Sequence, residues 1–126
     1  MKVRGIRGAT TVEHNEAEEI LASTVELLHQ IIAENNIEPE DICSVFVTTT
    51  HDLDATFPAR AIRQMQGWEL VPLMCSMEIA VKNSLEKCIR LMVLVNTDKS
   101  QKEIHHVYLN HASILRPDLK EKTSLS

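Results

Sequence analysis

The sequence predicts an α+β domain in which helices pack on one face of a small mixed β-sheet. Two observations support this prediction. Segments of β-branched and apolar residues alternate with helical patterns, and the chain of 126 residues has the length of one domain. The predicted order is strand, helix, strand, helix and then further strands. Because so small a sheet leaves one face uncovered, we expect a second copy of the chain to cover it and the protein to be a homo-oligomer.

The first predicted strand covers residues 2–12 and contains two of the three glycines, Gly5 and Gly8. Glycine inside a strand often marks a close approach by another backbone or by a ligand, although a simple turn at Gly8 is an equal alternative. Asn15 is expected to cap a helix whose apolar residues recur at three- and four-residue spacing until residues 35–36 end it. This helix should bury one face against the sheet.

The rest of the chain predicts one more helix and several strands. β-Branched and apolar runs are typical of strands, while Pro at the first position and Gly just beyond the last are typical of a helix. The predicted elements are a turn at residues 39–41, a strand at 42–50, a polar loop at 51–56, a helix from Pro58 that ends before Gly67, a short strand at 68–71, irregular helical turns within 73–87, and strands at 88–95, 104–109 and 112–115. We expect one domain over residues 1–118 and a polar, mobile tail over 119–126.

Composition and charge argue against several classes of function. Thirteen Lys and Arg against 18 Asp and Glu give a net charge of -5, which does not favour a DNA or membrane-surface partner. Two Phe, one Trp and one Tyr are too few for a protein that stacks nucleic-acid bases. The three cysteines form an odd set without C-x-x-C spacing, and neither a signal peptide nor a membrane span is visible. We therefore expect reduced thiols and a cytoplasmic protein.

Three arginines occupy positions where a structural role is hard to supply. Arg7 lies in the first predicted strand, Arg90 lies inside the apolar run CIRLMVLV, and Arg63 follows Arg60 on one face of the second helix. An arginine in an apolar strand must pair with an anion, extend to the surface or face an anion-binding site. For Arg90 the alternative is a salt bridge on a solvated sheet face. The residues that share its face at two-residue spacing are apolar, which favours an anion site.

Other polar residues give weaker signals. Tyr108, the only tyrosine, lies in a predicted strand, where packing is the commoner role. Glu78 lies in an otherwise uncharged segment and needs a donor or a cation nearby, unless it is simply exposed in a loop. His105 and His106 should point to opposite faces of a strand, so the sequence predicts no metal site. Cys75 has no nearby base and is expected to be an inert thiol. The sequence contains no nucleophile elbow, phosphate-binding loop or zinc motif.

A set of short motifs resembles the monofunctional trimeric chorismate mutases. The motifs occur in the family's order over nearly the whole chain: RGIRGATTVE at residues 4–13, FPARAIR at 57–63, Gly67-Trp68, Val71-Pro72, Cys75 with Glu78, KCIR at 87–90, HVYL at 106–109 and LRPDL at 115–119. Each motif alone is a weak signal, but the ordered set is specific.

The resemblance implies an isomerase that converts chorismate to prephenate in the biosynthesis of phenylalanine and tyrosine, without metal, cofactor or covalent intermediate. It also implies a homotrimer of the pseudo-α/β-barrel type, with active sites at the subunit interfaces. Arg90 would stabilise charge on the ether oxygen, and Glu78 would accept from the ring hydroxyl. Arg7, the third implied catalytic residue, would hold a carboxylate together with Tyr108. The full implied substrate-binding set is Arg7, Phe57, Ala59, Arg60, Arg63, Leu73, Met74, Cys75, Ser76, Met77, Glu78, Arg90, Tyr108, Leu115 and Arg116.

Two positions depart from the family pattern, and two other functions stay open. Arg60 stands where a lysine is familiar, which keeps the charge but changes its reach, and Met74 replaces a small hydroxyl residue. A related trimeric deaminase would release ammonia, and a regulatory module would bind an aromatic-pathway metabolite without turnover. Turnover of chorismate by the pure protein, without ammonia release, would separate a mutase from both.

Overall fold

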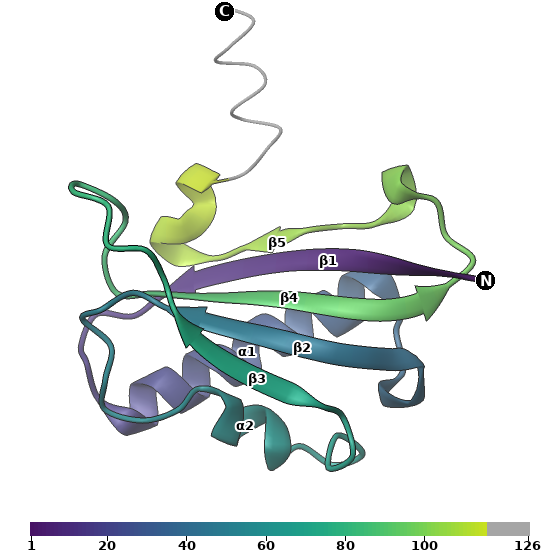
Figure 1. Cartoon of the computed structure of the whole chain (residues 1–126), viewed down its shortest axis with the longest axis horizontal. Helices are drawn as coiled ribbons and strands as arrows, with labels where there is room; N and C mark the ends of the chain where they lie inside the picture. Colours follow the sequence, from purple (N-terminus) through teal and green to yellow (C-terminus); the bar gives the residue numbers. More distant parts are fainter. Residues whose placement is uncertain (116–126) are drawn as a thin grey trace, which may run out of the picture.

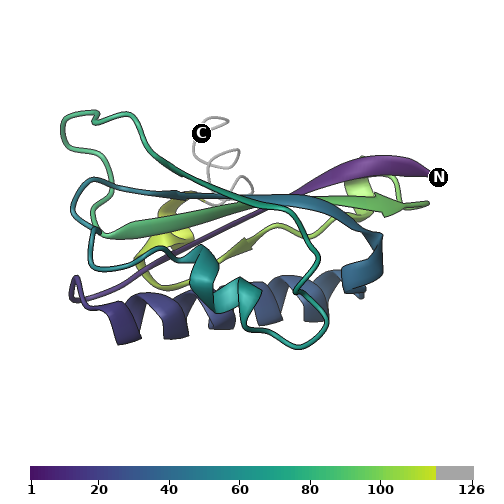
Figure 2. The same ribbon diagram turned by 60° about the horizontal axis from the view of Figure 1, so that its bottom comes forward.

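Residues 1–115, the part described by the computed structural model, form a five-stranded mixed sheet with helices on one face (Figures 1 and 2). The elements are β1 (Lys2–Thr11), α1 (Ala17–Asn35), η1 (Pro39–Asp41), β2 (Ile42–Thr49), α2 (Ala59–Arg63), β3 (Leu73–Met77), β4 (Cys88–Thr97), η2 (Gln101–Glu103), β5 (Val107–Tyr108) and η3 (Asn110–Leu115). This architecture confirms the predicted α+β class. Arg116 and the predicted tail at 119–126 lie outside the described residues.

The strands lie in the order β3-β2-β4-β1-β5. β4 runs antiparallel to its neighbours β1 and β2, while the edge strands β3 and β5 run parallel to theirs. β4, which is long and apolar, is the central strand of the five. As in other antiparallel pairs, one of its faces is buried against the core. Figure 2 shows α1 and α2 on the same side of the sheet. The opposite face carries neither of these helices, although at one end Ala112 of η3 packs against Ala9 and Cys88.

The core forms between α1 and the sheet. Leu27 and Ile31 of α1 are fully buried, and both approach β1 at Gly8. A Cβ atom at Gly8 would lie 2.6 Å from Ile31 Cδ1, which is closer than packed side chains allow. Gly8 lies inside β1 and not in a turn, and the close approach there is made by side chains of α1 and not by another backbone or a ligand.

The predicted start of α1 needs correction. The residue that precedes the helix is Glu16, and its side chain makes no capping hydrogen bond. Asn15, the predicted cap, instead accepts the backbone N–H groups of Asp54 and Ala55 at 3.1 Å each. The other end agrees with the prediction, because Asn36 adopts the left-handed conformation (φ 51°) that commonly ends a helix.

Three further predictions were wrong. Residues 68–71 form turns around the buried Trp68, and residues 112–115 belong to the 3₁₀ helix η3. The predicted helical turns within 73–87 begin instead with strand β3. That strand lacks β-branched residues, and its pairing with β2 spans a long stretch of chain, so local patterns did not reveal it. The predicted strand at 104–109 is reduced to the two residues of β5.

Within residues 1–115, no helix is long and apolar enough to cross a membrane.

Candidate active site

The face of the sheet opposite the helices, called here the open face, carries two rows of residues in register. The first row, the Arg90 row, consists of Ser76, Thr48, Arg90, Ala9 and Tyr108, one from each strand. Residues paired in register point to the same side of a sheet. On the central strands the neighbours of this row, such as Val47, Ile89 and Leu91, are buried in the core with the helices, so the row belongs to the open face.

A second row lies two residues away and is mainly apolar. It consists of Met74, Phe46, Met92 and Arg7, again in register across four strands. Phe46 and Met74 are 42% and 63% exposed, which is unusual for large apolar side chains on a central and an edge strand. The open face therefore combines a charged row with an adjoining apolar surface.

Arg90 is held in place by a carboxylate. Its Nε atom lies 3.1 Å from Glu78 Oε2, and the same oxygen accepts the Thr48 hydroxyl at 2.8 Å. Glu78 is positioned because its N–H donates to Thr49 O at 2.9 Å, which extends the pairing of β2 and β3 by one residue. The Glu78 side chain is 18% exposed and that of Arg90 is 44% exposed. This half-buried pair uses Nε of the guanidinium, so the Nη atoms remain able to bind an anion.

A cavity of about 340 Å³ opens over the two rows. It is lined by four of the residues that the sequence analysis selected, Arg7, Arg90, Tyr108 and Leu115. Six further residues line it that were not among the predicted site residues: Gly8, Ala9, Phe46, Thr48, Leu91 and Met92. The two-residue period of a strand could have placed Met92 beside Arg90. Phe46 and Thr48 depend on the pairing of β2 with β4, which no local pattern reveals.

The remaining predicted residues gather on another part of the chain. Two cavities, of about 550 Å³ and 480 Å³, lie between α2, the loop before it and β3, and they share Phe57 and Cys75. Arg60 lines the first and Arg63 the second. Together these two cavities are lined by Phe57, Ala59, Arg60, Arg63, Leu73, Met74, Cys75, Ser76 and Met77. In the described part of a single chain, these residues do not line the Arg90 cavity.

Cys88 shows that the thiol next to the charged row is unreactive. Burial, the largest effect, raises the pKa of Cys88 to about 11, although the charge of nearby Arg90 acts in the opposite direction. A thiol with so high a pKa stays protonated near neutral pH and is a poor nucleophile. Among residues 1–115, no three His, Cys, Asp or Glu side chains gather closely enough to hold a metal ion.

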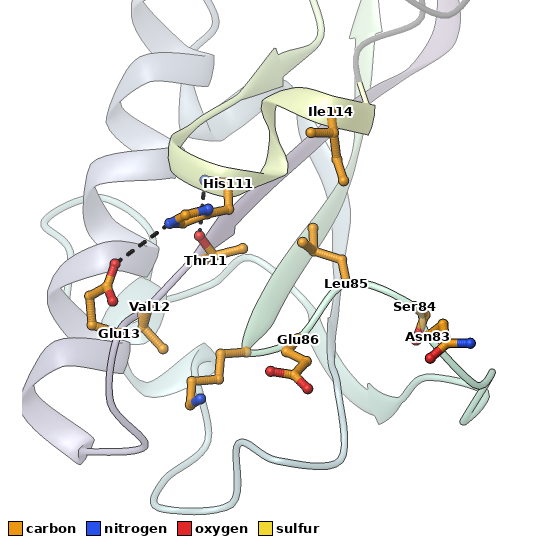
Figure 3. Close-up of a pocket in the computed structure, with 10 residues that line it drawn as sticks. Thr11, Val12, Glu13, Asn83, Ser84, Leu85, Glu86, His111 and Ile114 are labelled. Carbon is orange, nitrogen blue, oxygen red and sulfur yellow. Dashed lines mark hydrogen bonds and ion pairs between the residues drawn. The ribbon is translucent and has the colours of Figure 1, made fainter.

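A separate cavity of about 450 Å³ lies where the end of β1 meets residues 83–87 and η3 (Figure 3). His111 donates its backbone N–H to Thr11 Oγ1 at 3.1 Å, and its Nε2 lies 3.7 Å from Glu13 Oε1. Both side chains of the His111–Glu13 pair are about three-quarters exposed, so this contact contributes little stability. None of the sequence-selected residues lines this cavity.

Arginines, a tyrosine and a cation-bound carboxylate around a cavity on a small α+β domain form a site suited to an anionic small molecule. Comparison with known proteins identifies the family. The model of the family described as chorismate mutase type I matches residues 3–119. The chain belongs to this family, and it is therefore an isomerase of the chorismate mutase class, as the sequence motifs predicted.

Two curated relatives and one solved structure support the assignment. The chain is 51% identical over 119 residues to chorismate mutase AroH of Bacillus subtilis (strain 168), a match that covers 94% of each protein. It is 46% identical over 119 residues to chorismate mutase AroH of Thermus thermophilus, covering 94% of this chain and 97% of the relative. A solved chorismate mutase from Clostridium thermocellum is 54% identical and superposes with a TM-score of 0.85, covering 88% of this chain and 98% of that one.

Proposed function

We propose that this chain converts chorismate to prephenate at the Arg90 cavity, with Arg90 as the residue that stabilises the transition state. The observation that carries the proposal is the Arg90–Glu78 pair at 3.1 Å, set beside Arg7 and Tyr108 on the open face. Chorismate has two carboxylates, a ring hydroxyl and an enolpyruvyl ether. The cavity offers cationic and phenolic partners from Arg7, Arg90 and Tyr108, and Glu78, paired with Arg90, places a carboxylate beside it.

The reaction itself explains why so few reactive groups are needed. One carbon–oxygen bond of the ether breaks as one carbon–carbon bond forms, and no proton transfer or nucleophile is required. The protein must hold the enolpyruvyl side chain over the ring. The conformational entropy of this side chain is then lost on binding and no longer adds to the barrier of the reaction. It must also stabilise the negative charge that grows on the ether oxygen. The fixed guanidinium of Arg90 can supply that stabilisation because Glu78 already determines its orientation.

Each neighbouring residue has a proposed role. Arg7 and Tyr108 hold a carboxylate, because they lie on adjacent strands and line the same cavity. Glu78 accepts from the ring hydroxyl through Oε1, because its Oε2 already contacts Arg90 and accepts the Thr48 hydroxyl. These interactions involve ionised groups, which make the stronger class of hydrogen bonds.

We further propose that a complete site forms between two copies in a homotrimer. The residues around α2 and β3 line other cavities in one chain, although Ser76 and Met74 belong to the same two rows as Arg90 and Arg7. They include two arginines that suit the same anionic substrate. A second copy could bring its α2–β3 group against the Arg90 cavity. The exposed Phe46 and Met74 support this arrangement, because an apolar surface beside a charged row suits a subunit interface.

A mixing experiment tests the shared site directly. Arg90→Ala damages the first group, and the double variant Arg60→Glu with Arg63→Glu damages the second. If each site takes one group from each copy, mixed trimers of the two inactive proteins should contain some intact sites and regain activity. If all the groups act within one chain, no mixture regains activity. Sedimentation of a stable, fully active monomer would also contradict the shared site.

The activity itself is tested by the loss of chorismate absorbance when pure protein is added without a cofactor. Formation of prephenate without ammonia would exclude a deaminase, and turnover would exclude a purely regulatory module.

We also propose that the protein works in the cytoplasm. All three cysteines are free in the structure, which suits a reducing compartment.

A further inference from the structure

His106 lies at the point where β5 begins to pair with β1. Its ring Nδ1 atom accepts the backbone N–H of Arg7 at 2.9 Å. Backbone pairing between the two strands starts at the next position, where Gly8 is in register with Val107. The side chain of His106 therefore takes the place that a backbone carbonyl would have in a regular ladder.

The segment that carries His106 is fixed from a second direction by α1. Asn35 is fully buried at the end of this helix, and its Nδ2 donates to His105 O at 2.9 Å. Its Oδ1 accepts the His105 N–H at 2.8 Å. The backbone just before His106 cannot shift without breaking these two hydrogen bonds to a buried side chain. His106 is therefore held between α1 and β1.

We propose that His106 is a positioning residue whose neutral imidazole fixes Arg7, and with it the carboxylate-binding wall formed by Arg7 and Tyr108. This inference rests on the proposed function of the Arg90 cavity, which Arg7 and Tyr108 line. A carboxylate that does not react is bound similarly in the ground state and in the transition state. Displacing Arg7 should therefore raise KM more than it lowers kcat.

The hydrogen bond also depends on protonation. Nδ1 can accept only while it carries no proton, so the neutral ring holds its proton on Nε2. Burial is the largest effect that lowers the pKa of His106, followed by the positive charges of Arg7 on β1 and His105 on its own segment. From α1, the side chain that reaches this segment is the uncharged Asn35, which bonds the backbone of His105. Acid protonates Nδ1, which can then no longer accept the Arg7 N–H. Substrate binding should therefore weaken as the pH falls through the lowered pKa, which lies below the ordinary histidine value of 6.5.

Two variants separate the hydrogen bond from the side chain's bulk. In His106→Asn, the amide oxygen can replace Nδ1 as the acceptor but does not titrate. In His106→Leu, a side chain of similar size has no acceptor. At pH 7.5 we expect His106→Leu to raise KM for chorismate about 3- to 10-fold, with kcat changing less than about twofold. His106→Asn should keep a KM near that of the wild type, and this KM should stay flat down to pH 5, where the wild-type KM rises.

The adjacent His105 provides a matched control. His105→Asn keeps the backbone bonds to Asn35, so its KM and its acid dependence should match the wild type. The inference is wrong if His106→Leu has a wild-type KM, if His106→Asn keeps the acid-dependent rise, or if acid lowers the wild-type KM. If His106→Leu does not fold, as judged by circular dichroism, the comparison of His106→Asn with the wild type across pH still decides. Failure of the proposed function looks different, because the wild type would then not consume chorismate at all.

Discussion

The two faces of β4 differ from one residue to the next. Ile89, Leu91 and Val93 are buried in the main core with the helices, while Arg90 and Met92 alternate with them and line the cavity on the open face. The covered face holds the fold together by excluding water from apolar side chains. The open face carries the charge, together with apolar side chains left exposed. Substitutions at two adjacent residues of β4 should therefore have different effects, one on stability and the other on catalysis.

The largest expected effect is on the open face, at Arg90. If its charge stabilises the ether oxygen in the transition state, Arg90→Ala should raise the activation free energy by at least about 2.7–4 kcal/mol. This corresponds to a fall in kcat of about a hundred- to a thousand-fold. Arg90→Lys should restore only part of the rate, because an ammonium group cannot reproduce the planar guanidinium. Steady-state kinetics measures the effect, and circular dichroism should show an unchanged fold.

Replacement of Arg90 by citrulline isolates the charge from the shape. Citrulline is nearly isosteric and keeps most of the hydrogen-bonding groups, but it is neutral. The citrulline enzyme should lose most of kcat if the positive charge stabilises the transition state. A nearly normal kcat in an intact assembly would mean that confinement of the substrate, and not charge at this position, supplies the rate.

The next effect concerns stability and compares two glycines of β1. In Gly8→Ala the new methyl group would lie 2.6 Å from Ile31 Cδ1 and 3.2 Å from Leu27 Cδ1, both in the core under α1. We expect a loss of about 1–3 kcal/mol in the free energy of unfolding, with kcat per folded molecule preserved. Gly5→Ala is the matched control, because its nearest neighbour is the flexible Met92 side chain at 3.2 Å. Urea denaturation should show the smaller loss for Gly5→Ala, and the reverse order would contradict the comparison.

A smaller change on the covered face tests the same distinction next to Arg90. Ile89 is fully buried, so Ile89→Val removes one methylene from the core. The expected loss of stability is about 0.5–1.5 kcal/mol, measured by thermal or urea unfolding. The rate with saturating chorismate should not change. A large fall in kcat in a folded Ile89→Val protein would show that the two faces are coupled.

Acid should reveal a stabilising carboxylate outside both faces. Burial acts to raise the pKa of Asp52, but hydrogen bonds from the Thr50 hydroxyl and the Lys87 N–H outweigh it, and the pKa is lowered below 3.8. Because the folded state has the lower pKa, this stabilisation is complete above 3.8 and is lost as the pH falls through the lowered value. Asp52→Asn should therefore be less stable than the wild type at pH 6, by less than about 1 kcal/mol because solvent screens this exposed carboxylate. The difference should shrink toward pH 2, and a difference independent of pH would contradict this account.

Removal of metal should have the smallest effect, namely none. The proposed reaction uses positioning and charge from side chains alone. Dialysis against a strong chelator should leave the rate unchanged, and a loss of rate that zinc restores would contradict the mechanism.

Local patterns predicted the long elements well. The helical spacing found α1, runs of β-branched and apolar residues found β2 and β4, and alternation of residues found β1. Each of these elements buries one face, so its sequence repeats accordingly. Edge strand β3 was missed, since its parallel partner β2 is far away in the sequence. The apolar residues in 112–115 predicted a strand, but Ala112 is the buried residue of a 3₁₀ helix.

The candidate site could be predicted only in part for a related reason. Arg90 stood out because a charge inside an apolar strand is rare, and the motifs supplied Arg7, Glu78 and Tyr108. The contact between Glu78 and Thr48 arises from the pairing of β2 with β3 and β4, a property of the sheet and not of any segment. The hydrogen bond from Arg7 N–H to His106 Nδ1 was not predicted. It takes the place of a backbone hydrogen bond, and such a contact cannot be deduced from the spacing of residues.

The register of β1 and β4 has a consequence for how this sequence can change. Ala9 and Arg90 face each other across these strands, and so do Gly8 and Leu91. Inserting or deleting one residue within β4 would turn Arg90 into the apolar core and move Leu91 to the open face. The same change between β4 and β5, in residues 98–103, would leave both faces as they are. A change in length should therefore be tolerated in that connection. Inside β4, a change of one residue should abolish both folding and catalysis.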